Sequence, residues 1–215
     1  MAYSLVITPP GSEPVTVTQL HNELRIPTSF TQEDAQLQAY ITSARMALET
    51  SMHRQFVQTS AILYLDKWYR HQETWFQDAM MYNGSYDYGN FHGQRNIRIP
   101  TSPCQSVNSV QYYDSSNTLQ TLATTQYYCN TYLQPGTIHW ITTPGLYLNR
   151  SPRILINLTV GYSTVPQDIC SGILQLAQML YNNRSSETTD KFMRLSAFQG
   201  LINRYRTMEL DNYGL

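Results

Sequence analysis

The chain has 215 residues and a formal net charge of −1; 41% of its residues are hydrophobic and only 13% are charged. This length is enough to bury a hydrophobic core, and the near-neutral charge excludes a protein that binds nucleic acid chiefly by electrostatic attraction. The surface is left to uncharged polar residues and to 17 tyrosines, which suit protein contacts because tyrosine combines a large area with a polar tip. Such residues also keep a monomer soluble, so composition alone leaves both interpretations open.

The cysteines and the N-terminus bear on the compartment. Cys104, Cys129 and Cys170 are odd in number and widely spaced, which predicts free thiols rather than a zinc site or a disulfide framework. The first residues lack the basic start and long apolar core of a signal peptide, and no apolar run approaches the length of a membrane span. We therefore expect a chain of cytoplasmic origin.

Two helices are predicted after an extended, proline-marked lead. Thr16 and Gln19 form a capping-box pair, and Val15 and Leu20 have the spacing of a hydrophobic staple, which predicts a helix over residues 17–24. Pro27 interrupts this pattern.

The second helix is expected to start at Thr31 and to be amphipathic. Its apolar face repeats at helical spacing and continues toward Met52: Leu37, Ile41, Ala44 and Leu48. Its opposite, polar face is predicted to carry Gln36, Gln38, Arg45 and Glu49.

From about residue 56 the hydrophobic period changes from helical to two, which is typical of strands. Ile62 and Tyr64 alternate with Leu63 and Leu65, and turn-like sequences occupy residues 114–117 and 134–136. Further strands are predicted over residues 96–99, 107–113, 119–122, 126–132, 137–141 and 153–162. Short strands with frequent turns indicate a mostly antiparallel sheet or a small barrel.

A long aromatic loop interrupts the strands. Eight aromatic residues fall between Trp68 and His92, among several glycines and asparagines. Loops this long in compact domains tend to be functional or disordered. A binding loop and a self-packed surface loop are both open.

Two more helices are predicted at the C-terminal side. Pro166 suits a helix start, Asp168 suits the positive end of the helix dipole, and an apolar stripe follows at Ile169, Ile173, Leu176 and Leu180. After a polar break at residues 185–189, a last helix has the stripe Leu195, Phe198, Leu201 or Ile202, and Tyr205.

These elements predict an α+β fold, in which two N-terminal and two C-terminal helices form a core that brackets an antiparallel β insert. The expected parts of this one composite domain are residues 1–55, the insert 56–163 with its loop 68–93, residues 164–206 and a polar tail 207–215.

Catalytic signatures are missing from the sequence. It has no phosphate-binding glycine loop, no H-E-x-x-H and no G-x-S-x-G. His71 and His92 with Glu73, Asp78 or Asp87 could ligate a metal, but these residues lack the spacing of a metal site. We therefore expect no enzyme, no metal and no cofactor.

Four stretches, in this order, resemble the head–tail connector (adaptor, or head-completion) proteins of tailed bacteriophages. They are the threonine-capped stretch from Val15 to Ile26, the helix from Asp34 to Glu49, the strand pattern from Ile97 through Pro100 and Pro103 to Asp114, and the strand-to-helix joint from Val160 to Arg184. The resemblance covers about residues 15–206. The aromatic loop is longer than in the family pattern, and residues 207–215 extend past it.

The resemblance implies a structural protein of the virion neck, assembled in the host cytoplasm and needing no membrane. It implies a ring of twelve copies on the portal protein at the capsid vertex. Such a ring extends the channel through which double-stranded DNA passes without sequence-specific binding, and it offers a platform to the next neck or tail protein.

The resemblance also suggests where the partners bind. The C-terminal helix and tail are the portal-contact candidates: Arg194, Phe198, Ile202, Arg204, Tyr205 and Arg206. Their alternative role is packing within the chain. The aromatic loop is the candidate for a tail-side or inter-subunit contact, through Trp75, Phe76, Tyr82 and Tyr86.

Two other functions stay open. A carbohydrate-binding module could stack sugars on Trp68, Trp75 and Tyr86 of the loop 68–92, which explains the loop but not the bracketing helices. A metal-dependent hydrolase would require a bound metal.

Overall fold

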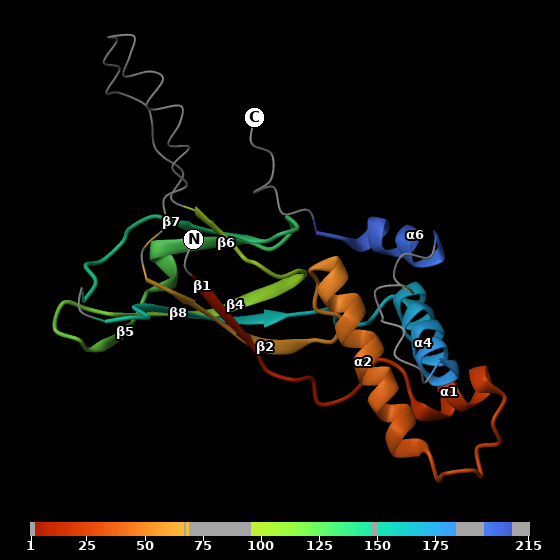
Figure 1. Cartoon of the computed structure of the whole chain (residues 1–215). Helices are drawn as coiled ribbons and strands as arrows, with labels where there is room; N and C mark the ends of the chain where they lie inside the picture. The colour runs from red at the N-terminus through yellow and green to blue at the C-terminus, as the bar shows by residue number, and fades with distance from the viewer. Residues whose placement is uncertain (1–2, 67, 69–95, 148–149, 184–195, 208–215) are drawn as a thin grey trace. The chain divides into compact units, whose positions relative to one another are not determined.

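The computed structural model describes residues 3–66, 68, 96–147, 150–183 and 196–207 (Figure 1). The chain divides into two compact units. The strand unit comprises Met1–Ile7, Ser60–Pro100 and Ser106–Thr159, and the helical unit comprises Thr8–Thr59, Thr101–Gln105 and Val160–Leu215.

Helix α1 (Val17–Leu24) begins where the sequence predicts it. The backbone N–H of Gln19 donates to Thr16 Oγ1 at 3.2 Å, and the backbone N–H of Thr16 donates to Gln19 Oε1 at 2.7 Å. This reciprocal pair is the expected capping box. Val15 and Leu20 are both buried in the same core cluster, as a hydrophobic staple requires.

Helix α2 (Asp34–Met52) carries the predicted apolar face but begins later than predicted. Leu37, Ile41, Ala44, Leu48 and Met52 are all fully buried. The predicted start at Thr31 is wrong, because the carbonyl of Thr31 accepts the N–H of Asp34 at 3.3 Å in a turn that precedes the helix. Glu33 occupies the N-cap, but its side chain does not cap the helix and instead accepts the Tyr181 hydroxyl at 2.7 Å.

Arg45 is a correction to the predicted polar face of α2. Its guanidinium is buried between two carboxylates: Nε lies 2.7 Å from Glu13 Oε2 and NH1 lies 2.5 Å from Glu49 Oε2. Glu49 also accepts the backbone N–H of Phe56 at 2.8 Å. Although burial acts to lower the pKa of Arg45, the hydrogen bonds and charges of Glu13 and Glu49 raise it overall, whereas burial raises the pKa of Glu49.

Helices α4 (Gln167–Asn182) and α6 (Ser196–Tyr205) complete the helical unit. Pro166 is the N-cap of α4, one position before the helix. Ile169, Ile173 and Leu176 are fully buried, and Leu180 packs against the same cluster. Helix α4 contacts α1, α2 and α6, so the expected packing of N-terminal against C-terminal helices is confirmed (Figure 1).

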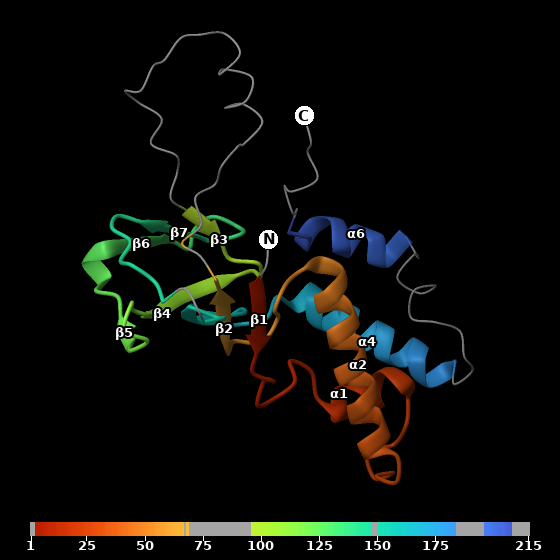
Figure 2. The same cartoon turned by 60° about the vertical axis from the view of Figure 1, so that its left-hand side comes forward.

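The strand unit contains two sheets rather than one sheet or a barrel (Figure 2). The five-stranded sheet has the order β1 (Tyr3–Ile7), β2 (Thr59–Leu65), β8 (Ile154–Val160), β4 (Cys104–Tyr113) and β5 (Leu119–Thr121). The three-stranded sheet has the order β3 (Asn96–Arg98), β7 (Thr137–Trp140) and β6 (Tyr127–Asn130), with the 3₁₀ helix η1 (Thr124–Gln126) before β6.

Most predicted strands are present, and their pairing is antiparallel where β1 meets β2, β4 meets β5, and β7 meets β3 and β6. The turn at residues 114–117 is confirmed: Asp114 Oδ1 accepts the backbone N–H groups of Ser116 and Thr118. Strand β1 was predicted only as an extended lead. It pairs from Tyr3 opposite Leu65 to Ile7 opposite Ala61. The predicted α+β fold is confirmed: in the described part of the sequence, α1 and α2 precede β2, and α4 and α6 follow β8.

Candidate assembly surfaces

Helix α6 is fixed to the helical unit by apolar side chains. Phe198 is 1% exposed and Ile202 is 6% exposed, and both belong to the core cluster. The side chain of Leu201 on α6 packs against α4 at Gly172, where a Cβ added to the glycine would lie 2.5 Å from Leu201 Cδ2. The small residue on α4 therefore lets the two helices approach closely.

Polar contacts hold the last turn of α6 against the start of α4. The Tyr205 hydroxyl lies 2.8 Å from both carboxylate oxygens of Asp168, and Arg204 NH1 donates to Asp168 Oδ2 at 3.2 Å. Partial burial acts to raise the pKa of Asp168, but the hydrogen bonds from Tyr205 and Arg204 lower it overall. Burial and the bond to Asp168 raise the pKa of Tyr205.

Arg54 and Thr207 also anchor this end of α6. Arg54 Nε donates to the backbone carbonyl of Tyr205, and NH1 donates to the Tyr162 hydroxyl at 2.8 Å. The N–H of Thr207 donates to the carbonyl of Met52 at 3.0 Å, and Thr207 is buried. Thr207 therefore belongs to the helical unit, and not to the tail in which the sequence analysis placed it.

The portal-contact candidates divide into two groups. Phe198 and Ile202 lie in the core, because each fills space between helices of this chain, so they position α6 and do not form its surface. The side chain of Arg204 is 71% exposed even though it contacts Asp168, and Arg206 is also exposed. Arg194 lies outside the described residues.

The aromatic loop lies outside the described residues except for Trp68, so Trp75, Phe76, Tyr82 and Tyr86 have no structural account. Trp68 Nε1 donates to the carbonyl of Pro144 at 2.8 Å. The rings of Trp140 and Tyr112 lie edge-on to Trp68, at centroid distances of 4.9 and 5.8 Å. Trp68 is thus a member of an intramolecular aromatic cluster, which does not favour a role as a sugar platform.

One surface that the sequence analysis missed is the hairpin of β6 and β7. Four of the nine exposed large hydrophobic side chains in the described part of the chain lie between residues 128 and 141: Tyr128, Tyr132, Leu133 and Ile141. The alternation in β6 and β7 could have indicated which side chains point away from the core, but it does not show whether another element covers them.

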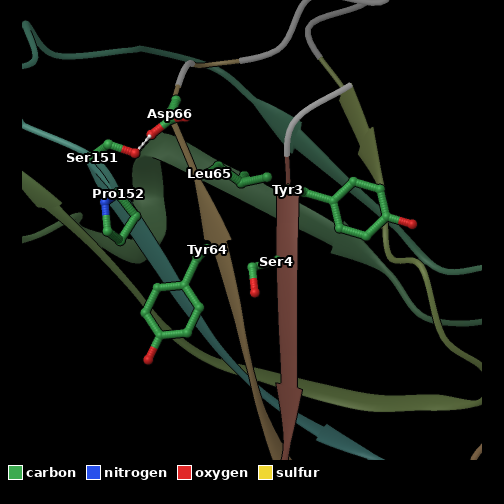
Figure 3. A pocket seen from close by; sticks show the side chains of 7 residues that line it. All are labelled: Tyr3, Ser4, Tyr64, Leu65, Asp66, Ser151 and Pro152. Atoms are coloured by element: carbon green, nitrogen blue, oxygen red, sulfur yellow. Dashed lines mark hydrogen bonds between the residues drawn. The ribbon is translucent and has the colours of Figure 1, made fainter.

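A shallow hollow of about 410 Å³ lies at the end of β1 and β2 (Figure 3). Tyr3, Tyr64, Leu65 and Pro152 supply most of its apolar lining. Its polar pair is Asp66 and Ser151, whose hydroxyl donates to Asp66 Oδ1 at 2.7 Å. A small-molecule site needs several convergent polar groups in an enclosed cavity, and this hollow lacks that arrangement.

The part of the chain that the structure describes shows no metal-binding cluster. No group of three or more His, Cys, Asp or Glu residues there could hold a metal ion. Cys104, Cys129 and Cys170, all within the described residues, are not joined by disulfide bonds. The histidine and acidic candidates around His71 and His92 lie outside the described residues. Among the described helices, none has the length and apolar character needed to cross a membrane.

Comparison by fold gives matches over almost the whole chain. A chain from the neck of an empty GTA particle, computed with C6 symmetry, matches with a TM-score of 0.70 and 20% identity, over 98% of this chain and 97% of that chain. The fold matches chains of gene transfer agent particles. A chain from the virion of a native gene transfer agent (GTA) particle matches with a TM-score of 0.69, at 19% identity and with the same coverage.

A third match is to the neck of a native GTA particle computed with C12 symmetry, with a TM-score of 0.61 and 18% identity over 95% of this chain and 97% of that chain. By sequence, no protein-family model matches the chain, and no curated protein matches it. The chain thus shares its fold with chains of GTA particles, two of them from structures of the neck, which agrees with the fold that the resemblance to head–tail connectors implies.

Proposed function

We propose that this chain is a structural protein of the neck of a tailed phage or a phage-like particle, and that it acts as a head–tail connector. The observation that carries the proposal is the match of helices and strands together, over 98% of this chain and 97% of a neck chain. A match confined to one unit would support only a shared module. Coverage of both chains supports the same kind of component.

Several copies would form a ring on the portal, twelve by the family resemblance. The solved necks with this fold were computed with C6 and C12 symmetry, which supports a multi-copy arrangement. Many modest, uncharged contacts repeated around a ring give avidity without one strong contact. A net charge of −1 also suits a channel wall, because a strongly cationic chain would bind the DNA that must pass.

The end of α6 is the proposed portal contact. Arg204 and Arg206 are exposed there and can reach acidic groups of a partner, and Tyr205 is fixed beside them by Asp168. Phe198 and Ile202 contribute by holding the helix in place. Arg194 and the residues after Thr207 remain candidates from the sequence.

The aromatic loop 68–93 remains the candidate for the tail-side or inter-subunit contact. The proposal needs no cofactor and no membrane. It also assigns no catalytic residue, in agreement with the particle origin of the solved chains that share the fold.

Deletion of the gene from the producing genome tests the proposal. We expect particles with filled heads and no attached tails, because the connector joins the two, and we expect the gene supplied in trans to restore joined particles. Normal tailed particles from the deletion strain would contradict a connector role.

A further inference from the structure

The outer face and tip of the β6–β7 hairpin, here called the hairpin face, comprise Tyr128, Tyr132, Leu133, His139 and Ile141. Tyr132 is 97% exposed, and Tyr128, Leu133 and Ile141 are each more than half exposed. Large contiguous apolar surfaces are rare on monomers and mark contacts with other molecules. Four exposed apolar side chains within fourteen residues of a single hairpin therefore mark it as a candidate contact surface.

The hairpin fixes the backbone positions that carry these side chains. Tyr128 lies opposite His139 in the register of β6 and β7, and their rings stack with centroids 4.5 Å apart and planes 1° from parallel. The neighbouring pair, Tyr127 and Trp140, is buried on the other face. The exposure of Tyr128 is thus imposed by the strand alternation, because turning it inward would expose Tyr127.

The tip is ordered by an asparagine turn. Asn130 Oδ1 accepts the backbone N–H groups of Tyr132 at 3.1 Å and Leu133 at 3.3 Å. This turn presents Tyr132 and Leu133 beyond the end of β6. Ile141, just after β7, is held by a hydrogen bond from its N–H to the carbonyl of Gln126 at 2.8 Å. A backbone ordered in this way loses little conformational entropy when a partner covers the side chains that it carries.

The hairpin also ends a sheet. Strand β6 is the last strand in the order β3-β7-β6, so among the described strands none pairs with its outer edge. An open edge beside an apolar face promotes association with other chains unless a partner covers it.

Charge decides among the classes of partner. Among the described residues on this face of the sheet, the exposed cation is Arg98 of β3. It lies opposite Thr137 of β7, at the border rather than in the hairpin face. A duplex DNA partner would need a cluster of cations, which the hairpin face does not have. A copy of this chain, with a net charge of −1, meets the face without appreciable charge repulsion. Tyrosine and leucine with few charges are also typical of the cores of protein–protein interfaces.

We propose that the hairpin face is the surface through which one copy of this chain contacts the next copy. The inference rests on the proposed function, since the symmetry of the necks with this fold makes a second copy the neighbour. A contact around a ring joins two different surfaces of identical chains. The hairpin face of one copy therefore docks on another surface of its neighbour, and not on the neighbour's own hairpin face.

Site-specific photo-crosslinking in assembled particles tests this directly. The photoreactive residue p-benzoylphenylalanine replaces Tyr132, whose ring is almost fully exposed, and the particles are irradiated. We expect a product of twice the chain mass whose peptides come from this chain alone, and we expect its crosslinked peptide to lie outside residues 128–141. Crosslinks to a different protein only, or no crosslink at all, would overturn the inference.

A paired substitution gives an independent measurement. In Tyr132→Ser/Leu133→Ser particles we expect the number of copies per particle to fall at least tenfold, while the purified chain keeps its melting temperature. The matched control is Phe30→Ser/Met46→Ser, which removes side chains that are 40% and 56% exposed in the helical unit and should leave the copy number unchanged. Equal copy numbers for both variants, or equal losses, would contradict the hairpin-face contact.

The two proposals fail differently. Wild-type particles without this chain in the neck would contradict the proposed function. Particles with the photoreactive residue at position 132 that contain the chain in the neck, but that give no self-crosslink, would contradict only the hairpin-face contact.

Discussion

Asp168 joins two helices through a single carboxylate. It accepts hydrogen bonds from the Tyr205 hydroxyl and from Arg204, both on the last turn of α6, while its own backbone starts α4. Its position in the first turn of α4 also favours a negative charge. The ionised carboxylate of Asp168 therefore helps to orient the proposed portal-contact end of α6, together with Arg54 and the apolar packing.

Removing this charge should give a pH-dependent loss of stability. Because the folded-state pKa of Asp168 is lowered, its contribution is complete above the unfolded pKa of about 3.9 and disappears as the pH falls through the folded value. We expect Asp168→Asn to lower the free energy of unfolding by about 1 kcal/mol at pH 7, since the site is partly open to solvent. Urea unfolding at neutral and at strongly acidic pH measures both values.

The difference in the free energy of unfolding between wild type and Asp168→Asn should disappear in acid, once Asp168 is protonated in both the folded and the unfolded state. Glu23→Gln, at an exposed carboxylate of α1, serves as the control and should change stability by less than about 0.5 kcal/mol. A gap of the same size at both pH values would contradict an electrostatic origin.

Gly172 and Gly200 lie in helices but should respond in opposite directions to alanine. A Cβ at Gly200 meets nothing within 4 Å, so Gly200→Ala should raise the free energy of unfolding by about 0.5–1 kcal/mol through the better helix propensity of alanine. A Cβ at Gly172 would lie 2.5 Å from Leu201 Cδ2, so the Leu201 side chain must move away from α4 and Gly172→Ala should lower the free energy of unfolding by about 1 kcal/mol. Chemical denaturation of the two variants measures both, and stabilisation by both would show that α6 does not pack on α4 at Leu201.

At the scale of elements, the parts set by local signals could be predicted from the sequence. The capping pair Thr16 and Gln19 predicted the start of α1, and the alternation from Ile62 to Leu65 predicted β2. Spacing alone likewise predicted the buried faces of α2 and α4. Each of these signals lies within the element that it predicts, which is why it can be recognised without knowledge of the fold.

The elements that depend on distant partners could not be predicted. Strand β1 forms by pairing with residues 61–65 of β2, and nothing near Tyr3 encodes that partner. Arg45 is polar by type and was placed on the solvent face, but Glu13, 32 residues earlier, allows it to be buried. The hairpin face was missed for a related reason. Whether a side chain is exposed depends on whether distant parts of the chain cover it, and local sequence does not show this.

The tail after α6 provides an element-scale prediction. Deletion should begin at residue 208, because Thr207 donates a backbone hydrogen bond to Met52 and is buried. We expect the chain without residues 208–215 to keep its melting temperature and to bind purified portal protein more weakly, by at least tenfold in Kd. Arg206→Ala is the companion variant at an exposed position. Portal binding equal to wild type in both variants would contradict docking through the C-terminal end.

At the scale of the whole molecule, the two units are suited to assembly rather than to chemistry. The helical unit has a continuous core to which α6 is attached by apolar packing, by Asp168 and by Arg54. The strand unit presents a preorganised apolar hairpin. A chain with this division can bind one partner through a helix end and another through a hairpin. In the proposed channel, its near-neutral charge would leave passing DNA free.

The central claim, that this chain is a neck connector, is tested most directly by cryo-electron microscopy of intact particles from the producing strain, with the neck reconstructed with and without imposed symmetry. The account predicts a ring of this chain between the portal and the first tail protein, with the end of α6 toward the portal. A neck whose density is fully explained by other proteins, with this chain absent from that position, would contradict it.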